Sequence, residues 1–330
     1  MSQQEPRDRG QAVYNKPALN HPELVALMQE RGLPIPDRAN AERHLRNIGY
    51  YRLSPYTIPF KRHDSDKFRD GIVFDDLLNL YFFDRKLRLL VLDALEPVEV
   101  AFRAAVTDHM SLPHGAFWYQ EAKHFRNRRH HNKFLQLVRD DCIDQLRAKP
   151  EQTDGTLVHR SALEHYLLTY GEPDLPPSWI VMERRTLGQM ERLVDNLKRR
   201  ADKTAIAKAL GINAPLLESW MRTFVRVRNI CAHHGRLWNT VLGVSPMLPT
   251  SPAVAWLSDR SAVAESTQRR ARLYPVLVAL QSLLLTLSPH STWASRLKSL
   301  IDEHPNLPLE AMGMPNDWFK DPFWAEQIKS

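Results

Sequence analysis

Apolar residues recur at spacings of three and four along most of the chain, which is the period of an amphipathic helix. The longest such stretch, 74–110, has room for about ten helical turns. We find no alternation of apolar and polar residues typical of a strand, and no internal repeat. The pattern predicts an all-α protein with helices at 21–31, 39–48, 74–110, 134–146, 162–170, 179–197, 203–210, 215–234 and 276–287.

Proline and glycine indicate where some of these helices begin, bend or end. Asn213 and Pro215 are residue types that favour a helix start, and Gly211 just before them ends the preceding helix. Pro97 lies inside the longest stretch, and we expect it to kink that helix or divide it in two, because proline has no amide hydrogen. The stretch 276–287 is the last strong helix, followed by a tail rich in proline and tryptophan.

Polar stretches suggest three parts of unequal size. Residues 65–71 are polar and provide the first boundary. We expect a small helical N-terminal module at 1–68, a main helical domain at 69–245, and a helical and irregular C-terminal extension at 246–330 that packs on the main domain.

Composition indicates which class of partner the protein binds and in which cell compartment it is found. The chain has 45 Lys and Arg against 38 Asp and Glu, and this net charge of +7 favours a polyanionic partner without requiring one. Its most apolar run, 276–287, is shorter than the ~20 residues of a membrane-spanning helix. Cys142 and Cys231 lie far apart and fit no disulfide framework or metal knuckle. We expect a soluble cytoplasmic protein with no membrane contact, metal or cofactor.

The helix at 215–234 carries the main candidate chemistry, in Arg228-Asn229-Ile230-Cys231-Ala232-His233. A histidine can deprotonate the 2′-hydroxyl of RNA or protonate the leaving 5′-oxygen, and an arginine can stabilise the charge that builds on phosphorus. Asn229 and His233 share a helix face, whereas Arg228 lies ~140° around the axis from His233, so spacing alone is a weak indication. Two copies facing each other across a two-fold axis would make a fuller site.

A basic patch and a tyrosine cluster each allow two interpretations. The residues around His130 and His131 either bind the RNA backbone or form a solvated surface, and no further ligand indicates a metal there. Tyr51 and Arg52 either stack on bases with neighbouring tyrosines or wedge the N-terminal module onto the main domain. The basic residues of the patch are Arg126, Arg128, Arg129 and Lys133.

The segment from Val227 to Asn239 resembles the signature of the Abi-like (AbiD/AbiF) abortive-infection family, a branch of the HEPN superfamily. Blocks on both sides resemble the family in the same order. They are Lys16-Pro17-Ala18-Leu19, Ile48-Gly49-Tyr50-Tyr51-Arg52-Leu53-Ser54-Pro55-Tyr56, Asp84-Arg85-Lys86-Leu87-Arg88, Pro177-Ser178-Trp179 and Met312-Gly313-Met314-Pro315-Asn316-Asp317-Trp318.

The resemblance implies a bacterial protein with a HEPN-type helical bundle, often dimeric, and a role in phage defence. It assigns Arg228 and His233 to the superfamily's R-x4-6-H ribonuclease motif, and Asn229 to the polar residue that follows the arginine. Some members work with a small non-coding RNA. Glu96, Glu99, Glu183 and Arg103 belong to the family pattern, and we expect them to form a buried polar network near the site. His234, next to His233, either titrates or packs, and Arg236 is a candidate RNA contact.

Three hypotheses follow for the function. The first is a metal-independent endoribonuclease, with His233 as acid or base, Arg228 stabilising the transition state and Asn229 orienting. The second is a non-catalytic RNA-binding module that forms a ribonucleoprotein with a small RNA. The third is a module that contacts only proteins. The first two share RNA as the partner, and all-α architecture suits each of them.

Overall fold

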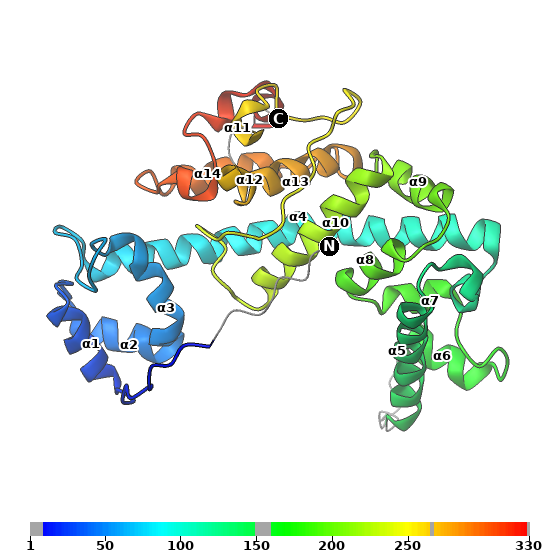
Figure 1. Cartoon of the computed structure of the whole chain (residues 1–330), viewed down its shortest axis with the longest axis horizontal. Coiled ribbons are helices and arrows are strands. Elements are labelled where there is room, and N and C mark those ends of the chain that lie inside the picture. The colour runs from blue at the N-terminus through cyan, green and yellow to red at the C-terminus, as the bar shows by residue number, and fades with distance from the viewer. Residues whose placement is uncertain (1–8, 149–159, 265–266, 329–330) are drawn as a thin grey trace. The chain divides into compact units, whose positions relative to one another are not determined.

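Helices form the regular secondary structure of this protein (Figure 1). The computed structural model describes residues 9–148, 160–264 and 267–328. Those ranges contain no β-strand, only two isolated bridges that pair Lys61 with Phe68 and Phe125 with Leu197. The all-α class predicted from the apolar periodicity is confirmed.

Contacts between residues divide the chain into two compact units, Met1–Phe82 and Phe83–Ser330. The first unit reaches further along the chain than the module expected at 1–68, because Phe74 and Leu77 are part of its apolar core. Its elements are α1 (His21–Glu30), α2 (Arg38–Ile48), α3 (Tyr50–Thr57), the 3-10 turn η1 (Ile58–Phe60) and the first turns of α4 (Phe74–His114).

The second unit holds the rest of α4 and the helices that follow it. Within it, α10 packs against α8, α9 and α13, and α5 packs against α6 and α8. The helices are α5 (Arg128–Arg147), α6 (Ala162–Thr169), α7 (Ser178–Glu183), α8 (Leu187–Asp195), α9 (Arg200–Ala209), α10 (Ala214–Ala232), α11 (Ser261–Ala264), α12 (Thr267–Arg270), α13 (Tyr274–Leu287), α14 (Trp293–Asp302) and α15 (Pro322–Ile328). Short 3-10 turns lie at η2 (Trp118–Gln120), η3 (Ala122–His124), η4 (Leu309–Met312) and η5 (Trp318–Lys320).

α4 is a single helix of 41 residues with Pro97 inside it. The expectation that Pro97 divides it is therefore wrong. A proline removes one helical hydrogen bond, but Ala94, Leu95, Val98 and Phe102 on both sides of it are buried. Packing of the two flanking turns into the core holds the helix together through the proline.

Two further predicted boundaries differ from the structure. Residues 179–197 form α7 and α8 rather than one helix, because Thr186 starts a new helix with a capping box. Its hydroxyl accepts from the Gln189 amide, and the Gln189 side chain accepts from the Thr186 amide. The tail also holds more helix than predicted, since α14 follows α13.

α5 begins six residues before the predicted start at 134. The Asn127 side chain accepts hydrogen bonds from the amides of Arg129 and His130 and caps the helix. His131 points into the core, where its Nε2 lies 2.8 Å from the Tyr119 carbonyl and its ring stacks on Phe125 at 4.3 Å. His131 is therefore a packing residue.

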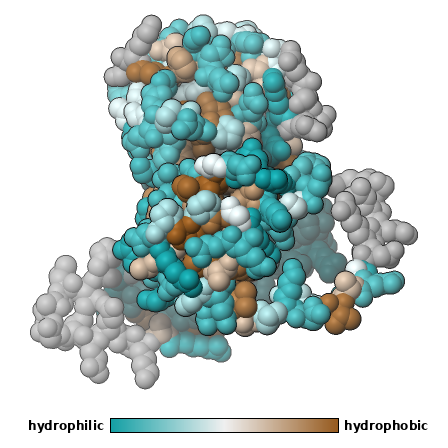
Figure 2. All heavy atoms as spheres, turned by 90° about the vertical axis from the view of Figure 1, so that its left-hand side faces the viewer, coloured by the Kyte–Doolittle hydropathy of each residue, from teal (hydrophilic) through white to brown (hydrophobic). Residues whose placement is uncertain are grey.

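Aromatic residues fill much of the second unit's core. Trp238, Trp318 and Trp324 are 1%, 2% and 0% exposed and belong to this core. The face in Figure 2 is mainly hydrophilic, with apolar side chains surfacing in limited areas. No helix in the described ranges combines the length and apolarity needed to cross a membrane.

One buried carboxylate, that of Asp84 on α4, fixes the segment that follows α10. It accepts hydrogen bonds from the amides of Leu237 (3.2 Å) and Trp238 (2.6 Å), and from Arg88 Nη1 at 2.5 Å. Arg88 Nη1 also lies 3.3 Å from the Gly235 carbonyl. Asp84 is 0% and Arg88 5% exposed, and a charge buried this deeply persists only when it is paired and hydrogen-bonded.

We expect Asp84→Asn to lower the free energy of unfolding by about 3–5 kcal/mol, because it leaves Arg88 buried without its counter-charge. Urea unfolding followed by circular dichroism measures this. The matched control is Asp93→Asn, which breaks an exposed pair with Arg296 (2.5 Å) and should cost less than about 1 kcal/mol. Equal losses in the two variants would contradict the role given to Asp84.

Stability should also fall in mild acid because of His131. Burial lowers the pKa of His131, despite an opposing effect of its hydrogen bond to Tyr119. The unfolded chain protonates this ring near pH ~6.5 while the folded chain excludes the proton, so the stabilisation is full above that pH and is lost as the pH falls below it. Urea unfolding at about pH 7.5 and about pH 5.5 measures the loss. His131→Gln should reduce the pH dependence, and His130→Gln, on the exposed neighbour, should leave it as in the wild type.

Candidate functional site

The candidate site lies at the C-terminal end of α10, where the backbone ends the helix with a capping turn. His233 is the last residue near helical geometry, and His234 adopts a left-handed conformation with φ 57°. The Gly235 amide donates to the Ile230 carbonyl (2.8 Å) and the His234 amide to the Cys231 carbonyl (3.0 Å). These two bonds form a Schellman motif, in which most helices place a glycine where this chain has His234.

Arg228 is held on the side of α10 that meets α4. Its Nε lies 3.9 Å from Oε2 of Glu99, which is 18% exposed, while the arginine side chain is 34% exposed. Only one edge of the guanidinium is directed to Glu99. The remaining N–H groups are available to an oxyanion such as a phosphate.

Glu99 is itself held by Arg103, one turn further along α4. Arg103 Nη2 donates to Glu99 Oε1 at 2.9 Å and to the Arg185 carbonyl at 3.2 Å. Arg103 Nη1 lies 3.8 Å from Glu183, and the Arg185 guanidinium pairs with Asp141 on α5. Positive and negative side chains therefore alternate along this network, which spans α4, α5, the α7–α8 connection and α10. Its Glu99 carboxylate orients the Arg228 guanidinium.

His233 and Asn229 stand in solvent. Both residues are exposed, and the His233 amide donates to the Asn229 carbonyl at 3.0 Å. In the described part of the chain the His233 ring forms no hydrogen bond or ion pair. Because α10 remains helical to Ala232, Arg228 and His233 stay on different sides of the axis, as the spacing predicts. An exposed imidazole at this position can exchange protons with a bound ligand.

Cys231, which lies inside the motif, takes no part in proton transfer near neutral pH. The side chain is 2% exposed, and burial, aided by Asp84, raises the pKa of its thiol to about 12. Arg88 opposes this shift weakly. The thiol stays protonated and packs in the core, and Cys142 is likewise free and buried.

The supporting residues expected around the motif lie in different environments. Arg103 is 13% exposed and belongs to the network described above. Glu183 is 68% exposed and touches the network only at its edge. Glu96 is exposed on α4, one turn before Glu99. Glu99, rather than Glu96, is thus the carboxylate that reaches Arg228.

The predicted basic patch is divided by the fold. Arg128, Arg129 and Lys133 lie exposed on the first turns of α5. Arg126 precedes the helix, where its guanidinium donates to the Asp195 carbonyl and lies 3.6 Å from the Asp195 carboxylate. Arg126 therefore belongs with the segment after α8, and the other three form a separate cationic surface.

The two residues predicted in the N-terminal module lie in the first unit. Tyr51 is 91% exposed on α3 and Arg52 beside it is also exposed. Arg236 is half-buried just after α10, where its carbonyl accepts from Thr240. In the described ranges no group of three or more His, Cys, Asp or Glu side chains is placed to hold a metal ion.

Two features of the site are visible in the sequence as helical spacings, but only the structure shows which other helix or segment these residues contact. Asp84 with Arg88, and Glu99 with Arg103, are acid–arginine pairs four residues apart on one helix. Arg222 and Arg226 are exposed on α10 and precede Asn229 and His233 at helical spacing. Such pairs and stripes are common on helices, so spacing does not reveal which of them face another element.

Comparison with known proteins gives one match. No curated protein and no solved structure matches the chain. The family model described as Abi-like protein matches residues 43–239, which is more than half of the chain and includes α4, α10 and the motif at 228–233. The chain therefore belongs to the Abi-like protein family.

Proposed function

We propose that this protein is a phage-defence endoribonuclease of HEPN type, and that its site is Arg228, Asn229 and His233. The observation that carries the proposal is the arrangement at the end of α10. A partly exposed arginine is oriented by a half-buried pair, Glu99 and Arg103, and an exposed histidine follows it at the end of the helix. Membership in the Abi-like family supports the role in abortive infection.

The reaction proposed is metal-independent transesterification of RNA. The 2′-oxygen attacks phosphorus and the bond from phosphorus to the 5′-oxygen breaks, which leaves a cyclic phosphate and a 5′-hydroxyl. His233 takes the proton of the 2′-hydroxyl or gives one to the 5′-oxygen. Arg228 stabilises the added negative charge on the phosphoryl oxygens, and Asn229 orients a phosphate oxygen. A homodimer would place a second His233 at the site for the other proton transfer.

We expect Arg228→Ala and His233→Ala each to lower the rate of RNA cleavage at least about 100-fold, because each removes a group that acts in the transition state. Cleavage of a labelled RNA by the purified protein measures this, with growth arrest on expression in bacteria as a second readout. Circular dichroism should not change, since both side chains are at least partly exposed. His290→Ala removes an exposed histidine elsewhere and is the control. A double variant that cuts at the wild-type rate would refute the proposal.

Glu99 is proposed as a positioning residue for Arg228. Glu99→Gln removes the charge that orients the guanidinium, and we expect kcat to fall about tenfold, which corresponds to ~1.4 kcal/mol, with KM little changed. Asp108→Asn, on an exposed part of the same helix, should keep the wild-type kcat. Partial recovery in Glu99→Asp would separate positioning from general loss of structure. A wild-type kcat in Glu99→Gln would contradict this role.

A second candidate function is RNA binding without cleavage, in a complex with a small non-coding RNA. The exposed cations on α10 favour it, because they would bind an RNA backbone whether or not His233 reacts. Sequencing the RNA that co-purifies with wild type and with His233→Ala separates the two functions. The same discrete RNA from both proteins, without cleavage products, favours binding alone. Protein free of RNA before any high-salt wash would favour a partner that is itself a protein.

A further inference from the structure

A cation-lined hollow lies where α9 begins, away from Arg228 and His233. It has a volume of about 260 Å3, and Arg126, Lys198, Arg200 and Lys203 contribute to its lining. Glu218 is the one acidic residue of that lining. The lining therefore carries a formal charge of +3, from four cations and one anion.

The four cations are not equally available. Lys203 is buried, and its Nζ donates to Glu218 (2.6 Å) and to the Asp195 carbonyl (2.8 Å). Arg126 is paired with Asp195, as described above. Lys198 and Arg200 are exposed, and neither side chain forms a hydrogen bond or ion pair in the described part of the chain. Two positive charges at the mouth of the hollow thus remain uncompensated.

The start of α9 intensifies this positive potential. Lys198, Arg199 and Arg200 are three consecutive cations at the N-terminal end of α9, where the helix dipole is positive. No side chain caps this end. Asp202 in the first turn compensates Arg199, whose Nε lies 4.0 Å from its Oδ2, but among the described residues it forms no ion pair with Lys198 or Arg200. Repulsion of this kind is relieved when an anion binds.

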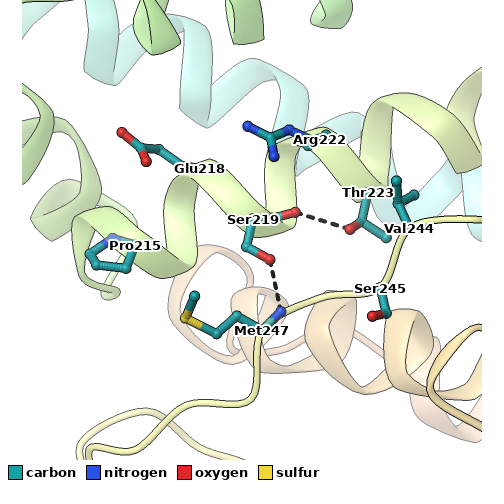
Figure 3. Close-up of a pocket in the computed structure, with 8 residues that line it drawn as sticks. All are labelled: Pro215, Glu218, Ser219, Arg222, Thr223, Val244, Ser245 and Met247. Atoms are coloured by element: carbon teal, nitrogen blue, oxygen red, sulfur yellow. Dashed lines mark hydrogen bonds between the residues drawn. The ribbon is translucent and has the colours of Figure 1, made fainter. Parts of the chain in front are cut away.

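A second hollow adjoins the first along α10 (Figure 3). It has a volume of about 370 Å3 and shares Pro215 and Glu218 with the first. Figure 3 shows Glu218 and Arg222 on one side of α10, and Ser219 on the side of the segment 244–247, where its Oγ accepts from the Met247 amide at 2.8 Å. Arg222 thus lines the second hollow and lies on α10 between the first hollow and His233.

From Arg222 an exposed stripe leads to the candidate site. Arg222, Arg226, Asn229 and His233 follow at spacings of four, three and four, so they lie on one face of α10 over a rise of ~16 Å. Glu191 is the acidic partner of this stripe, 3.7 Å from Arg222 Nε. A series of cations with this linear order matches a ligand whose anionic groups repeat along a chain.

We propose that the hollow at Lys198 and Arg200 binds a phosphate group of an RNA strand, and that Arg222 and Arg226 contact the backbone between it and His233. This inference rests on the proposed function, since it takes RNA as the ligand. It adds a binding site for phosphates outside the reacting one. Such a site fixes the path of the strand along α10, because the hollow lies beyond the Arg222 end of the stripe.

The test is RNA binding in full-length protein with His233→Ala, which separates binding from cleavage. The probe is a fluorescein-labelled oligouridylate, and its anisotropy gives Kd over a range of salt concentrations. Adding Lys198→Ala and Arg200→Ala should weaken binding about tenfold or more at ~0.1 M salt and make the log–log salt slope shallower by about 0.7, the value for one lost phosphate contact. Arg226→Ala should lower the slope by ~0.7.

The matched control is Lys208→Ala with Lys320→Ala, which removes the same charge from exposed positions outside the hollow. It should leave the slope unchanged. If the Lys198 and Arg200 variant binds RNA like this control, the inference is overturned while the proposed function stands. If pyrophosphate raises the Tm of the wild type but not of that variant, and RNA binding is the same in both, the hollow takes a small phosphate instead, which also overturns it. If the His233→Ala protein binds no RNA even at low salt, the proposed function fails first.

Discussion

The carboxylate of Asp84 is the interaction on which the arrangement of the site depends. It holds two consecutive backbone amides, those of Leu237 and Trp238, against the N-terminal third of α4, and Arg88 neutralises it in place. Without such a partner the chain after α10 would have polar backbone groups facing an apolar core, which is costly. The direction in which the chain leaves α10 is therefore determined by one side chain that precedes it by about 150 residues in sequence.

Electrostatic contacts between side chains orient the arginine of the candidate site. Arg228, Glu99 and Arg103 alternate in sign, and the carbonyl of Arg185 accepts from Arg103 at the inner end of the series. A guanidinium that is already oriented does not have to be reoriented when a phosphate arrives, and this is the physical basis of preorganised charge stabilisation. Arg103 Nε has no hydrogen-bond partner among the described atoms, so the network keeps one unused donor.

Much of the fold follows from local sequence, and most of the site does not. Apolar spacing is sufficient to predict helices such as α10, because every turn of that helix buries residues such as Leu217, Trp220 and Phe224. Apolar spacing does not locate the start of α5, because Asn127 caps a first stretch of charged and polar residues, among which only His131 is buried. Arg228 and His233 are assigned by the resemblance of residues 227–239 to the family signature, whereas the pairing of Glu99 with Arg228 depends on how α4 and α10 face each other. Periodicity within one helix carries no information on that packing.

The left-handed turn at His234 has a consequence for how the motif can vary. Because the last carbonyls of α10 are satisfied by the amides of His234 and Gly235, the helix cannot lengthen or shorten by a residue without losing those bonds. The turn thus fixes the residue at which α10 ends, and with it the place of every preceding residue on the helix surface. Inserting one residue between Arg228 and the turn would rotate Arg228, Arg226 and Arg222 together by ~100° while His233 stayed where it is. The position of the helix end thus determines the angle at which each preceding side chain leaves the axis of α10.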